Sequence, residues 1–161
     1  MLRWLWLSLL VIGLDQLTKQ LVEASLLVYE RVSLLPFFNL TLAYNEGAAF
    51  SFLSDQGGWQ RWFFVVLALV VTTALVVWLR QLGRGERRVA IALALIIGGA
   101  VGNLIDRLLF GHVIDFLDFY YGRWHWPAFN LADSAIFLGV VLMLLDALRD
   151  GRDPVPPRPG G

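Results

Sequence analysis

Asp115 and Asp133 are the residues of this chain best suited to do chemistry, because each carboxyl group lies in apolar sequence. Burial makes ionisation of a carboxyl group costly and raises its pKa. If two such groups lie a few ångströms apart, the first negative charge disfavours the second, and the pair holds one shared proton. That pair supplies a base to activate water and an acid to protonate a leaving amine. It is the minimum equipment for cleaving a peptide bond.

The same aspartates also have structural interpretations. Asp133 could cap a helix that opens after Pro127, and Asp115 could pair with Arg107. Asp118 could be a solvated loop charge. Paired carboxylates also serve proton relays and helix pairing in membranes, so their spacing alone leaves catalysis, transport and a structural role open.

Residue counts exclude several other kinds of chemistry. The chain has no cysteine, which excludes disulfides, thiolate metal sites and a cysteine nucleophile. With only two histidines and no HExxH motif, we expect neither a metal nor a cofactor. The formal net charge is +0, from 13 basic and 13 acidic residues, and no global field favours nucleic acid as a partner.

Two further polar groups interrupt apolar stretches. Asp15 and Lys19 are four residues apart with the acid first, the favourable order for a helical ion pair, and we interpret them as structural. Asn103 and Arg107 follow a glycine-rich segment in which the spacing of Gly98 and Gly102 lets another helix approach closely. A tight helix crossing therefore lies directly beneath an amide and a guanidinium group.

The composition requires a membrane to hold these residues. Hydrophobic residues make up 58% of the 161-residue chain, and charged residues make up 16%, against about 25% in soluble domains. A bilayer core needs about 20 apolar helical residues. Four stretches meet or nearly meet this length: Trp4 to about Leu21, Trp62 to Leu79, Val89 to about Leu109, and Phe129 to Leu148.

Arginine placement predicts the orientation of these helices. Basic residues gather near the ends of the chain and between the second and third stretches, which places both termini in the cytoplasm. The residues concerned are Arg3, Arg80, Arg84, Arg87, Arg88, Arg149, Arg152 and Arg158. Asp115 and Asp133 then lie at the same depth, near the outer surface.

The first outward connection, about residues 23–61, is too long and too patterned to be a mere linker. Residues Val32 to Ala43 partly alternate and are interrupted by Pro36, which predicts short strands. We therefore predict an all-α polytopic membrane protein with four transmembrane helices and a small outward-facing platform that contains β-strands. Residues 1–149 form one domain, and the proline- and glycine-rich tail 150–161 is expected to be disordered.

At these polar residues the chain resembles the lipoprotein signal peptidases, the bacterial signal peptidase II family. Five blocks occur in the family's order between about Trp4 and Arg149. They are Asp15-Gln16 with Lys19; Asn45-Glu46-Gly47-Ala48-Ala49-Phe50-Ser51; Gly98-Gly99-Ala100 with Gly102-Asn103 and Asp106-Arg107; Val113-Ile114-Asp115-Phe116; and Phe129-Asn130-Leu131-Ala132-Asp133-Ser134.

The resemblance implies an aspartyl endopeptidase that removes the signal peptide of prolipoproteins just before a diacylglyceryl-modified cysteine. Asp115 and Asp133 correspond to the catalytic pair. The residues implied to bind substrate or inhibitor, or to support the pair, are Asn45, Gly47, Asn103, Arg107 and Asn130. The resemblance also implies inhibition by globomycin and a location in the bacterial inner membrane with the site at the outer leaflet. We expect a monomer among membrane lipids.

The main alternative is a small proton-coupled transporter or channel that uses the same carboxylates. Transporters usually show paired repeats and a site near the bilayer midplane. This sequence shows no internal repeat, and its carboxylates are predicted at one membrane face. A purely structural membrane subunit is the third interpretation, and the clustering of Asn, Asp and Arg on the last two stretches argues against it.

Overall fold

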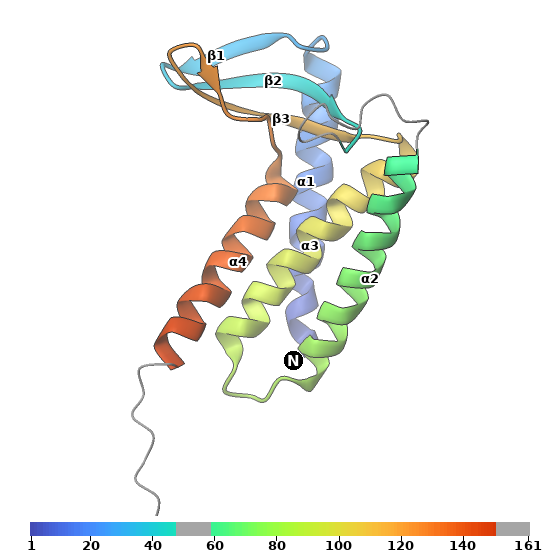
Figure 1. Ribbon diagram of the computed structural model, residues 1–161, viewed down its shortest axis with the longest axis vertical. Helices are drawn as coiled ribbons and strands as arrows, with labels where there is room; N and C mark the ends of the chain where they lie inside the picture. Colours follow the sequence, from blue (N-terminus) through green and yellow to red (C-terminus); the bar gives the residue numbers. More distant parts are fainter. Residues whose placement is uncertain (48–58, 151–161) are drawn as a thin grey trace, which may run out of the picture.

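Four long helices and one small sheet make up the described part of the chain (Figure 1). The computed structural model describes residues 1–47 and 59–150. A short 3-10 helix, η1 (Leu2–Trp4), leads into α1 (Leu5–Ser25), and the other helices are α2 (Trp59–Gln81), α3 (Arg87–Leu109) and α4 (Leu131–Asp150). The predicted disorder of residues 151–161, and the part of the second family block from Ala48 to Ser51, lie outside the described residues.

The four predicted spans are confirmed among the described residues. Each long helix is apolar enough to cross a membrane over the ranges Leu2–Ser25, Trp59–Gln81, Arg87–Leu109 and Leu131–Arg149. The first predicted stretch forms one helix that continues to Ser25. The amino end of the chain and the end of α4 both lie away from the sheet (Figure 1).

Helix α3 lies at the centre of the bundle, because small residues let its neighbours approach. Eleven of its 23 residues are buried, against three of 23 in α2. A Cβ added to Gly98 would lie 2.8 Å from the Cβ of Val11 in α1, and one added to Gly99 would collide with the carbonyl oxygen of Ala132 in α4. The glycines of the third family block therefore set the distances from α3 to both α1 and α4.

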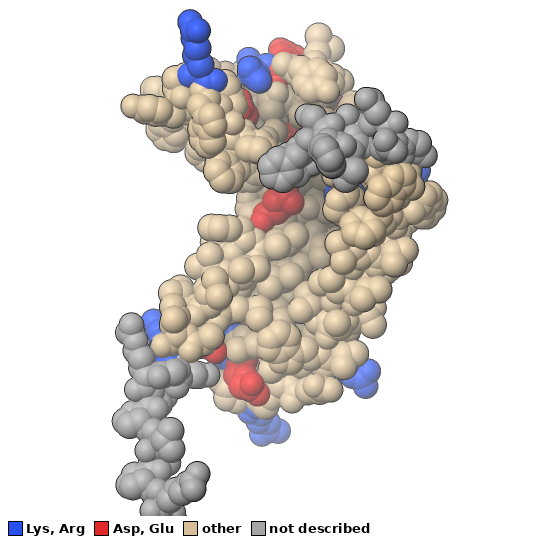
Figure 2. Space-filling model, viewed as in Figure 1, with Lys and Arg blue, Asp and Glu red and all other residues tan. Residues whose placement is uncertain are grey.

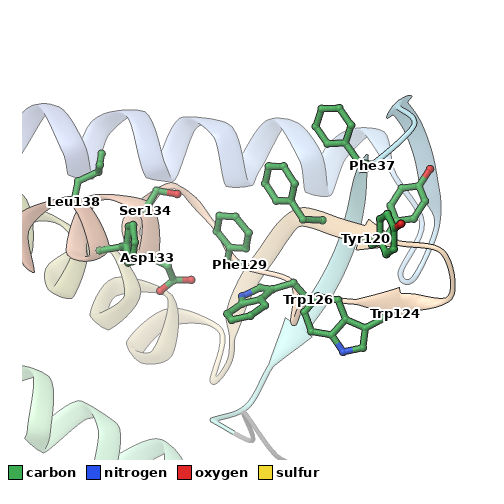
Figure 3. Close-up of a pocket in the computed structure, with 11 residues that line it drawn as sticks. Phe37, Tyr120, Trp124, Trp126, Phe129, Asp133, Ser134 and Leu138 are labelled. Carbon is green, nitrogen blue, oxygen red and sulfur yellow. The ribbon is translucent and has the colours of Figure 1, made fainter. Parts of the chain in front are cut away.

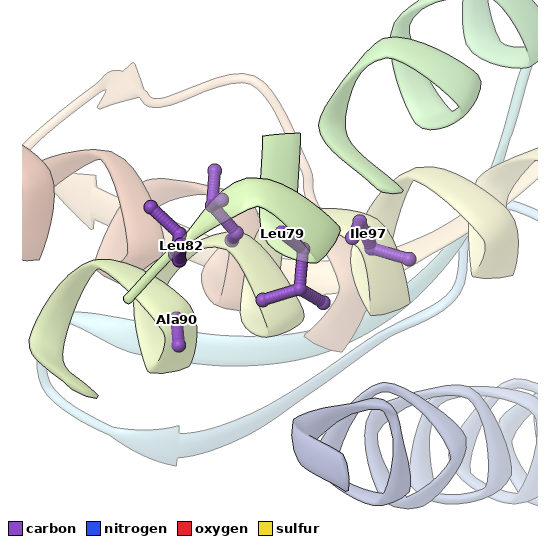
Figure 4. Close-up of a cluster of buried hydrophobic side chains, with 5 residues drawn as sticks. Leu79, Leu82, Ala90 and Ile97 are labelled. Atoms are coloured by element: carbon purple, nitrogen blue, oxygen red, sulfur yellow. The ribbon is translucent and has the colours of Figure 1, made fainter. Parts of the chain in front are cut away.

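A hydrophobic cluster lies where α2 leads into α3 (Figure 4). It joins the end of α2 to the first half of α3. Its buried members are Leu79, Leu82, Ala90, Leu93 and Ile97. This packing fixes α2 against the central helix.

The sheet is antiparallel, with strands in chain order: β1 (Arg31–Leu35), β2 (Phe38–Asn45), β3 (Val113–Tyr121) and β4 (Trp124–His125). The strands predicted on either side of Pro36 are confirmed. The connection between α3 and α4, which we did not predict to contain strands, supplies β3 and β4. The platform is thus built from both outward connections.

The pairing of β2 with β3 places a polar side chain beside Asp115. Ala43 lies opposite Asp115, and Asn45 lies opposite Val113, two residues along each strand. Diagonal neighbours on one face of an antiparallel pair are within reach of each other's side chains. The register therefore brings Asn45 to Asp115.

Candidate active site

Asp115 and Asp133 meet at the junction of the sheet with the helices. Asp115 lies in β3 and is 2% exposed, and Asp133 lies in the first turn of α4. Asn130 donates a hydrogen bond from Nδ2 to Asp115 Oδ1 at 2.8 Å, and Asn103 donates from Nδ2 to Asp133 Oδ1 at 2.7 Å. Asn130 Nδ2 also lies 3.1 Å from Asn103 Oδ1. A continuous path of hydrogen bonds thus connects the two carboxyl groups.

Asn130, and not Asp133, occupies the cap position of helix α4, because the helix begins at Leu131 and Asp133 is its third residue. The backbone N–H of Asn130 donates to Asp133 Oδ2 at 3.2 Å, and the N–H of Asp133 donates to Asn130 Oδ1 at 2.9 Å. This reciprocal arrangement is a capping box, which satisfies two N–H groups at the helix start. It holds Asp133 and Asn130 in fixed positions while leaving Asp133 Oδ1 to Asn103.

Asn45 and Gly47 extend the site from β2. Asn45 donates from Nδ2 to Asp115 Oδ2 at 3.0 Å, and its Oδ1 accepts the backbone N–H of Gly47 at 2.9 Å. Gly47 has a φ of +104°, and a Cβ there would lie 2.5 Å from the Phe64 ring. Glycine is therefore required at this turn, which orients the amide of Asn45 toward Asp115.

Lys19 lies beneath the pair and is fully buried. Its Nζ lies 2.7 Å from Asp15 Oδ2, 2.8 Å from Asp106 Oδ2 and 3.0 Å from Asn103 Oδ1. An ammonium group has three donors, so these contacts use all of them. The structure brings Asp15 and Lys19 together as predicted, and it adds Asp106, a residue of the third family block for which no role was predicted.

The other hydrogen bonds of Asp15 and Asp106 connect α1 and α3 to the rest of the site. Asp15 Oδ1 accepts the backbone N–H of Ala132 in the first turn of α4 at 2.9 Å. Asp106 accepts the amide of Gln16 at 2.7 Å and the backbone N–H of Ile114 at 3.1 Å. The three-residue spacing from Asn103 to Asp106 places both side chains near Lys19, and this spacing was the available sequence signal for Asp106.

Arg107 lies next to the same amide network. Its guanidinium group lies 3.4 Å from the carbonyl oxygen of Asn103 and 4.9 Å from the centre of the Phe64 ring. Among the described residues, its Nε is buried without a hydrogen-bond partner. Arg107 also interacts electrostatically with Asp133 and Asp115. Among the described residues Arg107 forms no ion pair with Asp115, which was one structural alternative for Asp115, and it brings positive charge and an unpaired Nε donor to the site.

The environment of Asp115 favours its protonated form. Burial, and next the negative charge of Asp133, raise the pKa of Asp115 to about 7. Hydrogen bonds from Asn45 and Asn130 oppose this rise, because they stabilise the charged form. Asp115 can therefore hold or release a proton near neutral pH.

Asp118 is not a solvated loop charge, so that interpretation is wrong. It lies in β3, is 3% exposed, and accepts hydrogen bonds from Asn39 at 2.9 Å and from His125 at 2.8 Å. Burial raises the pKa of Asp118, but these hydrogen bonds lower it by more, so the pKa lies below its usual value. Asp118 belongs to the strand pairing of the platform, and sequence reasoning missed it because β3 was not predicted.

An aromatic pocket of about 700 Å³ opens beside Asp133 (Figure 3). Its walls come from the sheet, from the segment before α4 and from α4 itself. The lining residues are Phe37, Phe119, Tyr120, Tyr121, Trp124, Trp126, Phe129, Asp133, Ser134, Phe137 and Leu138. Most of this surface is apolar, and Asp133 provides its charged group. We did not predict the pocket from the sequence.

The charge distribution on the visible face separates the site from the helix surface. Figure 2 shows an acidic patch in the hollow where the platform meets the helices, above a broad band without charged side chains. Within residues 1–47 and 59–150, no group of three His, Asp or Glu side chains is arranged to hold a metal ion. The arrangement is suited to acid–base chemistry at the edge of an apolar surface.

Comparison with solved structures defines the class of fold. The chain superimposes with a TM-score of 0.85 on a bacterial membrane enzyme determined by the in meso method at 2.3 Å resolution, at 28% identity, over 99% of this chain and 96% of the other. A second bacterial membrane enzyme, determined by the same method at 1.9 Å, gives a TM-score of 0.82 at 31% identity, over 93% and 95% of the two chains. The fold is that of a bacterial membrane enzyme.

Sequence comparison then gives the family. The family model described as signal peptidase (SPase) II matches residues 7–149. The lipoprotein signal peptidase of Aeromonas hydrophila subsp. hydrophila is 58% identical over 149 residues, covering 92% of this chain and 89% of the relative. That of Pseudomonas aeruginosa strain PAO1 is 54% identical over 150 residues, with 92% and 89% covered. The chain belongs to the signal peptidase II family, and it is therefore a membrane peptidase, as the sequence motifs predicted.

Proposed function

We propose that this protein removes the signal peptide of prolipoproteins by cleaving just before the diacylglyceryl-modified cysteine, with Asp115 and Asp133 as an aspartyl catalytic pair. One observation carries the proposal. The two carboxyl groups come from different elements, are joined through the amides of Asn103 and Asn130, and lie beside an apolar pocket. The lipoprotein signal peptidases that the chain resembles supply the substrate class.

The pair would act with one shared proton. Near neutral pH the raised pKa of Asp115, about 7, keeps a proton available beside Asp133. The ionised carboxylate would take a proton from water as the water attacks the scissile carbonyl carbon. The protonated carboxyl would then give its proton to the leaving amide nitrogen. Either aspartate can fill either role in this scheme.

The amides would fix the pair, and the guanidinium group would face the substrate. The side-chain nitrogens of Asn45, Asn103 and Asn130 already donate to the two carboxyl groups. Arg107 retains a buried Nε without a partner among the described residues, so it has a donor for the oxygen that becomes negative during attack. We therefore assign orientation to the three asparagines and oxyanion stabilisation to Arg107.

The aromatic pocket would receive apolar parts of the substrate. A cavity of about 700 Å³ with Asp133 at its edge has the size and lining of a site for an apolar ligand. Contacts with acyl chains and with the signal helix, both remote from the reacting carbonyl, would position the scissile bond. Globomycin would inhibit by occupying the same region.

The membrane setting follows from the same scheme. Arginines at the helix ends opposite the sheet favour a cytoplasmic location for both termini in the bacterial inner membrane. The platform and the catalytic pair would then lie at the outer leaflet, where a lipid-modified cysteine is anchored. We propose that residues 1–149 act as a single domain and as a monomer.

Cleavage by the purified full-length chain tests the proposal. A diacylglyceryl-modified prolipoprotein should be cut before its modified cysteine, and globomycin should block the reaction. Asp115→Asn and Asp133→Asn should each reduce the rate by at least about 100-fold, because each removes an acid–base group. Asp146→Asn is the matched control, since Asp146 pairs with Arg88 far from the site. Retained turnover in either site variant would refute the catalytic pair, and solute transport without cleavage would refute the peptidase assignment.

A further inference from the structure

Three arginines line one cavity at the end of the bundle opposite the proposed active site. The cavity has a volume of about 480 Å³ and is lined by Arg3, Arg84 and Arg87, with Met1 and Leu2. The arginines come from η1, from the connection between α2 and α3, and from the first residue of α3. Segments far apart in sequence therefore bring like charges to one place.

Among the described residues, no acidic side chain forms an ion pair with these arginines. Within the described ranges, none of Arg3, Arg84 and Arg87 forms an ion pair, and no acidic residue lines the cavity. The neighbouring Arg88, by contrast, lies 3.8 Å from Asp146. Like charges that gather in this way repel one another, so a bound anion would stabilise the arrangement.

The start of α3 adds to the positive potential of the cavity. Glu86 occupies the cap position of this helix, but its side chain does not cap the helix, and its carboxylate instead accepts the backbone N–H of Gly83 at 2.7 Å. The first N–H groups of a helix carry partial positive charge. Arg87 is the first residue of the helix, so its side chain starts at the positive end of the helix dipole.

The position of the cavity in the membrane indicates which anion binds there. It lies where the apolar spans of α1, α2 and α3 end, beside the buried cluster formed by Leu79 and Leu82. That is the depth of lipid phosphate groups rather than of the hydrocarbon core. Guanidinium groups bind phosphate oxygens in a bidentate manner, and basic pockets between membrane helices bind anionic headgroups.

We propose that Arg3, Arg84 and Arg87 form a binding site for the phosphate group of an anionic phospholipid. The bound headgroup would bridge the beginning of α1 to the α2–α3 connection. The site is separate from the proposed catalytic pair, so its test does not depend on the peptidase assignment.

Lipid retention measured by native mass spectrometry tests the site. Detergent-purified full-length protein is titrated with dioleoyl phosphatidylglycerol and, in parallel, with dioleoyl phosphatidylcholine. The triple variant R3Q/R84Q/R87Q is compared with R80Q/R88Q/R149Q, which removes three positive charges from the same end without touching the cavity. The single variant R84Q changes one exposed turn residue, so it still tests the site if the triple variant fails to fold.

The expected result is selective loss in the cavity variants. Phosphatidylglycerol should bind about fivefold more weakly for each arginine removed from the cavity, and within about twofold of wild type in the control triple variant. Phosphatidylcholine binding should be the same in all proteins. Equal loss in both triple variants, or no loss in R84Q and R3Q/R84Q/R87Q, would overturn the site. Binding of inorganic phosphate that is lost in R3Q/R84Q/R87Q, without selective binding of phosphatidylglycerol by the wild type, would assign the cavity to a free anion and overturn the lipid assignment.

Discussion

Lys19 Nζ lies 3.0 Å from the side-chain oxygen of Asn103, and this contact determines which way the Asn103 amide faces. An ammonium group can only donate hydrogen bonds, so the atom that faces it must be the oxygen. The amide nitrogen of Asn103 then points to Asp133, 2.7 Å away. A buried lysine in α1 thereby places a hydrogen-bond donor on one member of the proposed catalytic pair.

Replacing Lys19 by Met should destabilise the protein and slow cleavage. The change leaves the buried carboxylates of Asp15 and Asp106 without their cation, which costs about 3–5 kcal/mol when one partner of a buried ion pair is removed. The thermal unfolding midpoint in detergent measures this loss. The variant that also carries Asp15→Asn and Asp106→Asn should recover stability in part but not the cleavage rate, because Asn103 is still free to turn. A Lys19→Met protein as stable as the wild type would contradict the assignment.

Stability should depend on the protonation of Asp115. The folded-state pKa of about 7 lies above the ordinary aspartate pKa of 3.8, so protonated Asp115 favours the folded state. The stabilisation by protonated Asp115 is fully present below about pH 4 and is lost as the pH rises through about 7. It amounts to roughly 4 kcal/mol at most. The Asp115→Asn side chain stays neutral at every pH. As the pH rises over this range, the unfolding midpoint of the variant should therefore increase relative to that of the wild type. Parallel pH curves for the two proteins would rule out this linkage.

Removing the hydrogen bond from Asn45 should shift the pH profile of cleavage. Asn45 stabilises the charged form of Asp115, so Asn45→Ala should raise the pKa of Asp115 further. The alkaline limb of the kcat/KM profile should then move to higher pH. Asn39→Ala is the matched control, because Asn39 lies on the same strand and donates to Asp118 instead. A shift of equal size in both variants would assign the effect to the platform as a whole.

Gly99→Ala should separate α4 from α3 and reduce cleavage. The added methyl group would collide with the carbonyl oxygen of Ala132, in the helical turn that carries Asp133. Misplacement of a reacting group by about 1 Å can cost on the order of 100-fold in rate. Gly13→Ala offers a control, because a Cβ there meets nothing within 4 Å, and it should stabilise helix α1 by up to about 1 kcal/mol. Equal cleavage rates in the two variants would show that the close approach is not needed.

The helices of this fold follow from the sequence because their signal is local. A run of apolar residues about 20 long predicts a membrane span without knowledge of its neighbours. The strands around Pro36 were predicted for the same reason, since alternation and an interrupting proline are visible within a dozen residues. Both kinds of element were found within a few residues of the predicted bounds.

The parts that escaped prediction depend on partners far away in the chain. Strand β3 pairs with β2, so that Asp115 meets Ala43, and nothing in the segment Val113–Tyr121 reveals this partner. Asp106 likewise meets Lys19 across the interface between α3 and α1. The aromatic pocket needs side chains from the sheet, from the segment before α4 and from α4 together. Long-range packing decides all three, and the burial of Asp118 follows from the first.

The hydrogen bond from Ala132 N–H to Asp15 Oδ1 joins the first long helix to the last. During synthesis α1 enters the membrane long before α4 has been translated, so Asp15 lacks this hydrogen-bond partner until α4 is present. The proposed catalytic pair is equally incomplete until then, since Asp133 arrives with α4. An unfinished chain therefore holds no assembled site, and peptide-bond cleavage becomes possible only after the ribosome has delivered the final span.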